Sequence, residues 1–262
     1  DRFATILPVI SRRRVRMYKM AAFLPLLLMA GKLEAATTNY DLTTDWSDTN
    51  NPNGVWRLLT GNVLLPHQSS FAGCFNNTPG ITGGWAPGNV VGNCIPAFFK
   101  ATGTGFNNDY FAGDLLVHSV DGNNGSGHGQ AFVTWTAPAD GTIDYSGSMW
   151  YAHDSVRRSN DFLLTLGVNI LAQGTIAYNS GFTRSNPDQF SGNGYVVHSG
   201  DVIALEIYES PGNGEGSLDG FSLRVTETTA DPSPSAPEPG TMILVAAGSL
   251  CAVQFKRMTA SR

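Results

Sequence analysis

The stretch 201-DVIALEIYE-209 decides the fold class of this chain. Its side chains divide into two alternating sets, with Ile203, Leu205 and Ile207 on one face and Val202, Ala204, Glu206 and Tyr208 on the other. Successive side chains of a β-strand point to opposite faces, so a period of two predicts a strand with one side in a hydrophobic core.

Further short segments share this alternation and are bounded by Gly, Asn, Asp or Pro. They are GVWRLL (54–59), DLLVHSV (114–120), QAFVTWTA (130–137), GTIDYSGSMWY (141–151), DFLLTLGVNIL (161–171), GYVVHSG (194–200) and GFSLRVTE (220–227). The sequence APADG at 137–141 supplies a turn between two of them. Capped apolar stretches with helical spacing are absent from this region. We therefore expect an all-β fold, a jelly-roll-like antiparallel β-sandwich from about Asp41 to Thr228.

The length and composition allow one folded domain with additional segments at either end. The chain has 262 residues, with 30 Gly, 14 Pro and 14% charged residues. We expect four parts: an upstream extension and signal peptide (1–36), the β-sandwich domain (37–229), a Pro-rich linker (230–240) and a C-terminal hydrophobic helix with a basic tail (241–262).

The expected domain is strongly acidic. Between Thr37 and Asp231 there are six Lys and Arg residues against 18 Asp and Glu residues, a formal charge of −12. Such a domain repels phosphate backbones and anionic lipid headgroups. The charge therefore argues against nucleic-acid or membrane-surface binding by the folded part, and favours solubility and attraction of cations.

The head of the chain has the three parts of a secretory signal. A basic region (11–20) precedes the apolar run AAFLPLLLMAG (21–31), and small residues near Ala35 or Ala36 suit a cleavage site. A transmembrane anchor is the weaker alternative, because the apolar run is shorter than the ~20 residues that span a bilayer. We expect export, with Met17 or Met20 as the true start.

If the chain is exported, its cysteines can form a disulfide. Cys74 and Cys94 lie in one stretch rich in Gly, Pro and Asn, whereas Cys251 lies in the C-terminal apolar run. In an oxidising compartment the natural pairing is a disulfide between Cys74 and Cys94, which adds about 3 kcal/mol to stability by the chain-entropy model. The alternative is two free buried thiols.

The C-terminal segment begins with ADPSPSAPEPG (230–240), which predicts an extended, solvated spacer. An apolar run, Met242–Phe255, follows and ends at Lys256 and Arg257. Such a run is marginal as a permanent span, but with its basic stop it can hold the end of a protein in the membrane. A helix packed on the domain would need a polar face, which this run lacks.

Three features in this order resemble the PEP-CTERM sorting signal: the motif Pro237, Glu238 and Pro239, an apolar helix with a central Gly248, and a basic finish. The resemblance implies that an exosortase-type enzyme recognises the tripeptide while the helix holds the chain in the inner membrane. It also implies removal of the tail as the protein moves to the cell surface or extracellular matrix. The basic finish is sparser than is usual in that family.

The body of the chain is similar to a recurrent domain of exported bacterial proteins that carry this tail. The segments that carry this similarity are NPNGVW (51–56) and WTAP (135–138). The similarity implies a fold and a location and supplies no activity.

Catalytic motifs are not found. The five His residues are scattered, and the chain has no HExxH, CxxC or G-x-S-x-G sequence. We therefore expect a non-catalytic protein with no cofactor. A structural calcium ion would fit a jelly-roll fold, and Asp109, Asp114 and Asp219 are the acids to consider, although each suits a turn as well.

Two functions of different classes follow. The first is an exported, non-catalytic surface or matrix protein, and the alternative is a carbohydrate-binding module. Trp85, in the loop TGGWAPGN (82–89), is the candidate for stacking on a sugar ring, because such a loop buries little. Equally, Trp85 could cap the sandwich edge beside the proposed disulfide. The partners expected are the processing enzyme and a polysaccharide or the extracellular matrix.

Overall fold

The computed structural model describes residues 35–71, 74–75, 78–105, 109–121, 130–153 and 156–229, and this part of the chain is built of antiparallel β-strands. The strands are β1 (Thr37–Asp41), β2 (Trp56–Thr60), β3 (Val63–Leu64), β4 (His67–Gln68), β5 (Gly84–Trp85), β6 (Ala97–Lys100), β7 (Leu115–His118), β8 (Ala131–Thr136), β9 (Gly141–Tyr151), β10 (Ser159–Leu166), β11 (Asn169–Ala177), β12 (Asp188–Val197), β13 (Val202–Glu209) and β14 (Leu218–Thr229). Within the described ranges, no helix is long and apolar enough to cross a membrane.

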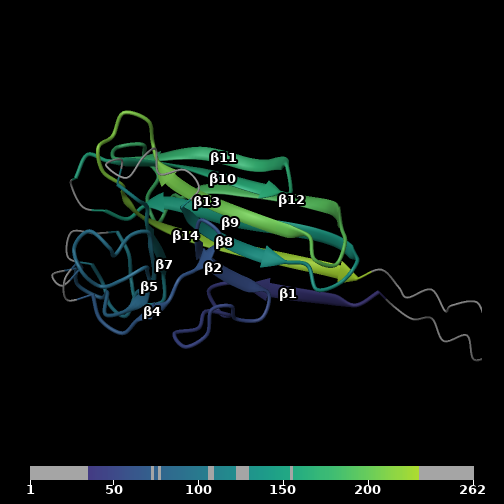
Figure 1. Ribbon diagram of the computed structural model, residues 1–262. Coiled ribbons are helices and arrows are strands. Elements are labelled where there is room, and N and C mark those ends of the chain that lie inside the picture. The colour runs from purple at the N-terminus through teal and green to yellow at the C-terminus, as the bar shows by residue number, and fades with distance from the viewer. Residues whose placement is uncertain are drawn as a thin grey trace, which may run out of the picture. The chain divides into compact units, whose positions relative to one another are not determined.

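The strands form two sheets that face each other (Figure 1). One has the order β12-β9-β14-β7-β6-β5-β4, and β1 pairs with the second half of β14. The other has the order β11-β10-β13-β8-β2-β3. The all-β expectation is therefore confirmed, and the two facing sheets form a β-sandwich. From β7 onward almost every connection crosses from one sheet to the other.

The main core lies between the sheets. The predicted inward face of β13 is confirmed, because Ile203, Leu205 and Ile207 are all fully buried. Side chains of both sheets join them in one cluster, which includes Trp135 of β8 and Phe221 of β14. Burial of these apolar surfaces is the main favourable term that holds the sheets together.

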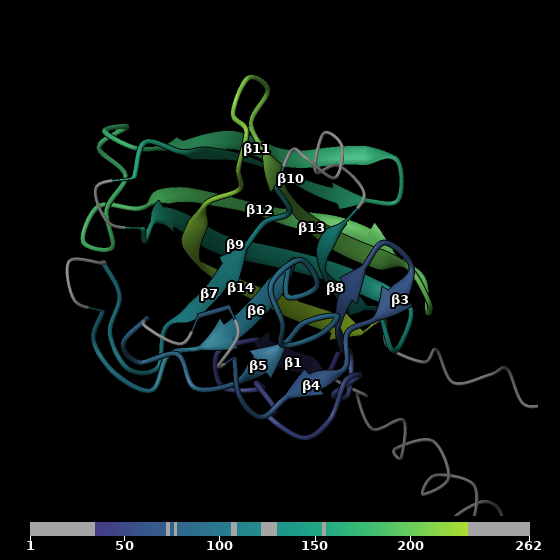
Figure 2. The same ribbon diagram turned by 60° about the vertical axis from the view of Figure 1, so that its left-hand side comes forward.

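A second apolar cluster covers the outer face of the eight-stranded sheet. Phe71 and Ile81, from the long segment between β4 and β6, pack there with Trp150 of β9 and Leu116 of β7. Strands β6 and β7 are therefore buried on both faces, so AFF (97–99) and LLV (115–117) are apolar at successive positions, where an alternating pattern was expected for β7. Figure 2 shows β4, β5, β6 and β7 together, in the part of the sheet away from β12.

One expectation from the sequence needs correction. The segment DFLLTLGVNIL, expected as one strand, is broken by a turn at Gly167, whose φ of +58° favours glycine, and continues as the separate strand β11. The expected connection at 137–141 is confirmed, and it joins β8 and β9 of different sheets. Three of the expected parts lie outside the described residues. They are the signal peptide (except Ala35 and Ala36), the Pro-rich linker and the C-terminal helix.

Candidate functional site

The candidate site lies at the end of the sandwich where β7 and β9 finish and β10 and β14 begin. The predicted disulfide is present: Cys74 and Cys94 are bonded, with their Cα atoms 6.5 Å apart, and are not free thiols. The bond ties the segment after Phe71 to the segment that leads into β6. It therefore fixes the two loops to each other beside the outer apolar cluster, against which Phe75 packs.

A pocket of about 240 Å³ lies beside this disulfide. It is lined by Cys74, Phe75, Val91, Gly92, Cys94, Ile95, His118, Asp121, Arg158 and Glu215. The disulfide-linked loops contribute the apolar lining, which includes Phe75, Val91 and Ile95. The polar and charged groups come from the end of β7, which contributes His118, and from loops next to β7, β10 and β14. A pocket with one apolar side and a few convergent polar groups is the usual form of a small-molecule site.

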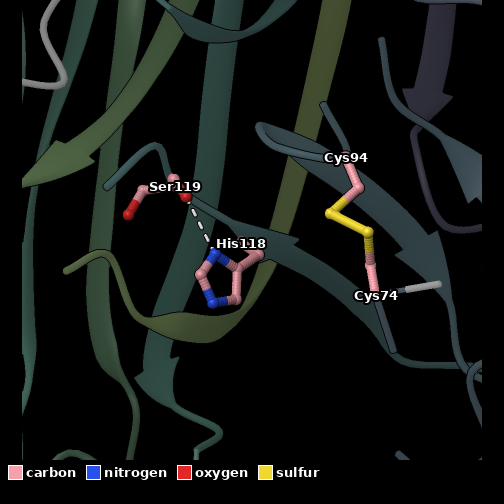
Figure 3. Close-up of a disulfide and its surroundings, with 4 residues drawn as sticks. All are labelled: Cys74, Cys94, His118 and Ser119. Atoms are coloured by element: carbon pink, nitrogen blue, oxygen red, sulfur yellow. Dashed lines mark hydrogen bonds between the residues drawn. A yellow bond between two sulfur atoms is a disulfide. The ribbon is translucent and has the colours of Figure 1, made fainter. Parts of the chain in front are cut away.

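His118, the last residue of β7, supplies an imidazole to the pocket. Figure 3 shows the ring near the Cys74–Cys94 bond, with Nδ1 bound to the carbonyl oxygen of Ser119 at 2.8 Å. Because a carbonyl oxygen can only accept, Nδ1 carries the hydrogen. Burial lowers the pKa of His118 below its ordinary value, which favours the neutral ring.

Charged residues complete the polar wall. Asp121 accepts a hydrogen bond from the backbone N–H of Gly216 at 2.9 Å. Arg158 donates to the carbonyl oxygen of Gly216 at 2.9 Å and forms an ion pair with Glu215. The Arg158 bond holds the turn before β14 against the start of β10, and the Asp121 bond holds it against the segment after β7, so that both define the shape of this wall.

A buried polar network supports His118 from behind. The Ser119 hydroxyl donates to Oδ1 of Asn160 at 2.6 Å, and the Asn160 amide donates to the Ser217 carbonyl and to Oδ2 of Asp219, at 3.0 and 2.7 Å. Ser119, Asn160 and Asp219 are fully buried. The network fixes Ser119, whose carbonyl in turn sets the orientation and tautomer of His118.

Asp219 is the member of this network with an unsatisfied oxygen atom. Its Oδ1 is buried without a hydrogen-bond partner. Burial raises the pKa of the Asp219 carboxyl well above its usual range, and its polar contacts with the side chains of Asn160 and Ser217 oppose this rise only in part.

The exposed position predicted for Trp85 is wrong. Trp85 is 4% exposed and packs in the main core, and the centroids of its ring and of the His67 ring lie 5.0 Å apart. The indole N–H donates to the carbonyl oxygen of Ser47 at 2.9 Å. The pairing of β5 with β4 and β6 draws this short loop segment into a sheet, so Trp85 cannot stack on a sugar.

The acids considered for calcium do not converge. Asp114 forms a two-pronged ion pair with Arg184, and Asp109 accepts the backbone N–H of Arg184 at 2.6 Å. Asp219 lies apart from them in the interior network. In the described ranges, no three or more His, Cys, Asp or Glu side chains are grouped to hold a metal ion.

The sorting motif Pro237, Glu238 and Pro239 lies outside the described residues. Among the pocket residues, sequence reasoning named only the two cysteines as a site, and missed Phe75, Asp121, Arg158 and Glu215. These four residues come from separate loops and have no local motif, so a single sequence gives no signal that they meet.

The architecture and site define an all-β, disulfide-containing sandwich with a pocket at one end. No family model and no curated protein matches the chain. Solved structures with some similarity include a C-terminal CBM6 of a marine laminarinase from Zobellia galactanivorans (14% identity, 43% of this chain and 80% of that one, TM-score 0.24). A family 35 carbohydrate-binding module from Clostridium thermocellum has 15% identity over 49% of this chain and 88% of that one, with a TM-score of 0.28.

The K3 adhesin domain of Lys-gingipain from Porphyromonas gingivalis is similar over more of the chain. It covers 73% of this chain and 98% of its own length, at 8% identity and a TM-score of 0.33. TM-scores and identities this low assign neither a family nor a ligand to the chain.

Proposed function

We propose that the folded domain binds carbohydrate in the pocket beside the Cys74–Cys94 disulfide. The observation that carries this proposal is the division of the pocket into an apolar lining, which includes Phe75 and Ile95, and a polar lining, which includes His118 and Asp121. A sugar ring has the same division, because its C–H groups form an apolar face and its hydroxyl groups form hydrogen bonds at the edge. The volume of about 240 Å³ is below the roughly 300–1,000 Å³ of most ligand pockets, so we expect the pocket to hold no more than one sugar ring.

We propose binding without catalysis. Glycosidases need two carboxyl groups that flank the scissile bond, one as an acid and one as a base or nucleophile. The carboxylates of this pocket are engaged with the protein itself, since Asp121 accepts from Gly216 and Glu215 pairs with Arg158. These contacts favour a fixed binding wall over a pair of reactive groups.

The test is a glycan array probed with the purified full chain, followed by titration calorimetry on the glycans retained. Val91 lines the pocket and is 83% exposed, so Val91→Arg obstructs the pocket without disturbing the core. Its neighbour Val90 is 57% exposed and does not line the pocket, which makes Val90→Arg the matched control for added charge and bulk.

We expect Val91→Arg to weaken binding by at least about tenfold, equivalent to 1.4 kcal/mol, and Val90→Arg to leave it unchanged. Retention of no glycan, or equal affinity in both variants, would show that the pocket is not a carbohydrate site. Release of new reducing ends from a retained glycan would contradict the absence of catalysis.

We further propose that the chain is exported and sorted to the cell surface or extracellular matrix. The signal-like head (1–36), the motif Pro237–Pro239 and the apolar run that follows it support this destination. The Cys74–Cys94 bond supports it independently, because disulfides persist in oxidising compartments outside the cytosol. An exosortase-type enzyme is the partner proposed, with an intermediate held in the inner membrane by the C-terminal helix.

Intact mass of the mature protein tests the sorting proposal. We expect loss of the head to about Ala35 in any exporting host, and loss of the tail from the Pro237–Pro239 motif onward only where an exosortase is present. A tail that remains attached in both hosts would contradict sorting by this enzyme.

A further inference from the structure

The pocket presents hydrogen-bond acceptors to a ligand. His118 uses Nδ1–H to bind the Ser119 carbonyl, so the nitrogen left for a ligand is Nε2. In the neutral ring this nitrogen carries a lone pair and accepts. The buried Ser119–Asn160 contact of 2.6 Å keeps the ring in this tautomer, because it fixes the residue whose carbonyl holds Nδ1.

The carboxylates of the pocket add further acceptors. Asp121 gives one oxygen to the Gly216 N–H, and a carboxylate has about four lone-pair sites in all. The side chain of Glu215 is 55% exposed, so its ion pair with Arg158 leaves part of the carboxylate open to solvent.

The charges of the pocket do not cancel. Its lining contains the carboxylates of Asp121 and Glu215 and the guanidinium of Arg158. Arg158 is paired with Glu215 and also donates to the Gly216 carbonyl. One guanidinium therefore faces two carboxylates, and the described lining has a formal charge of −1 when His118 is neutral.

We infer that the pocket selects a sugar with a free ammonium group, a hexosamine, over a neutral hexose, and that it excludes uronic acids. This inference rests on the proposed carbohydrate binding. An ammonium group is a triple donor with a positive charge, which matches His118 Nε2 and the Asp121 carboxylate. A uronate carboxylate would meet the acceptors of His118 and Asp121. It would also have to compete with Glu215 and the Gly216 carbonyl for Arg158, the cationic donor in the described lining.

The experiment measures affinities of the full chain for four methyl glycosides with the same ring configuration: glucosamine, N-acetylglucosamine, glucose and glucuronic acid. The pH is kept below the pKa of the glucosamine amine. Charge-assisted hydrogen bonds are about twice as strong as neutral ones, so we expect glucosamine to bind at least about tenfold more tightly than glucose. Glucuronic acid should bind more weakly than glucose.

Asp121→Asn tests the charge directly, because the amide retains an oxygen for the Gly216 N–H. Asp144→Asn is the matched control, since Asp144 likewise accepts a glycine N–H, that of Gly194 at 2.8 Å, and does not line the pocket. We expect Asp121→Asn to remove most of the preference for glucosamine over glucose, and Asp144→Asn to preserve it.

The two proposals fail in different ways. If glucose or glucuronic acid binds as tightly as glucosamine, and Val91→Arg still abolishes binding, the pocket is a carbohydrate site and the inference about ammonium sugars is wrong. If none of the four sugars binds while the array retains other glycans, the inference about ammonium sugars is wrong. If the array retains no glycan, or if Val91→Arg leaves the affinities unchanged, the proposed function itself is wrong. An unchanged preference in Asp121→Asn would also overturn the inference.

Discussion

Asn160 and Asp219 are hydrogen-bonded across the interior of the sandwich, with Nδ2 of one 2.7 Å from Oδ2 of the other. Asn160 belongs to β10 in the six-stranded sheet and Asp219 to β14 in the eight-stranded sheet. A polar bond between the sheets, at the end next to the pocket, fixes how the sheets meet there. It does so at the cost of burying a carboxyl group.

Asp219→Asn should raise stability at neutral pH. The raised pKa of Asp219 means that the native state holds this proton more tightly than the unfolded state, so stability is lost as the pH rises through the native pKa. An asparagine removes the buried charge and keeps an oxygen for Asn160. We expect a gain of about 1 kcal/mol or more, a shift in Tm of roughly 2–4 °C, which shrinks toward acidic pH.

Urea denaturation at several pH values measures this effect. The exposed Asp140 provides the control. Its carboxylate accepts the backbone N–H of Ser199 at 2.8 Å, and the amide oxygen in Asp140→Asn can keep this bond while the exposed charge is removed. If Asp219→Asn is less stable than the wild type at neutral pH, and the difference does not change sign as the pH is lowered, the ionised carboxylate is favourable in the fold.

His118 should make the domain sensitive to mild acid. Because burial lowers its pKa, the unfolded state binds the proton more readily, and stability falls as the pH drops below about 6.5 toward the lower native pKa. In His118→Asn the amide can still donate to the Ser119 carbonyl, but it does not titrate. We expect Tm to fall more in the wild type than in this variant between neutral and mildly acidic pH. Parallel curves would contradict the assignment of a depressed pKa.

The disulfide should stabilise both the fold and the pocket. Cys74 and Cys94 are 20 residues apart in sequence, and closing a loop of this length adds about 3 kcal/mol by the chain-entropy model. Replacing both with alanine should lower the free energy of unfolding by about this amount and weaken ligand binding, because the bond holds the apolar wall.

A reductant separates this effect from simple loss of side-chain packing. It should lower the Tm of the wild type and leave that of the double alanine variant unchanged. A wild type whose Tm and ligand affinity are insensitive to reductant would show that the bond is not formed in solution.

Gly220 should not tolerate a side chain. A Cβ at this position would lie 2.0 Å from atoms of the indole ring of Trp150, which belongs to the outer cluster. We expect Gly220→Ala to cost at least about 1–3 kcal/mol, since a well-packed core cannot absorb the overlap. Gly214→Ala, where a Cβ meets nothing within 4 Å, should change stability by less than about 0.5 kcal/mol. Similar denaturation curves for the two variants would contradict the close packing of Trp150.

The strands with one buried face were predictable from the sequence because their side chains alternate. β13 shows this directly, and Trp150 and Tyr151 lie on opposite faces of β9 as their neighbouring positions require. Strands β4 and β5 were not predictable, since two-residue strands carry no period and depend on pairing with β6.

The burial of Trp85 has the same cause. Its local sequence is that of a loop, and only the pairing with His67 and Phe98 places it in the core.

The pocket is less predictable from the sequence than the position of Trp85. Val91, His118 and Arg158 meet through the sheet topology, and the intervals between them in the sequence have no chemical meaning.

Ala36 and Thr229 are joined by a backbone hydrogen bond of 2.9 Å, so the chain enters and leaves the sandwich at one point (Figure 1). β9 runs from Gly141, which pairs with Thr229, to Tyr151 near the pocket, a length of about 33 Å. A fusion partner or a surface tether at either junction would thus leave the pocket unobstructed. The same adjacency makes the domain suitable for circular permutation, with a short peptide that links 229 to 36 and new ends opened at the exposed turn at Val168.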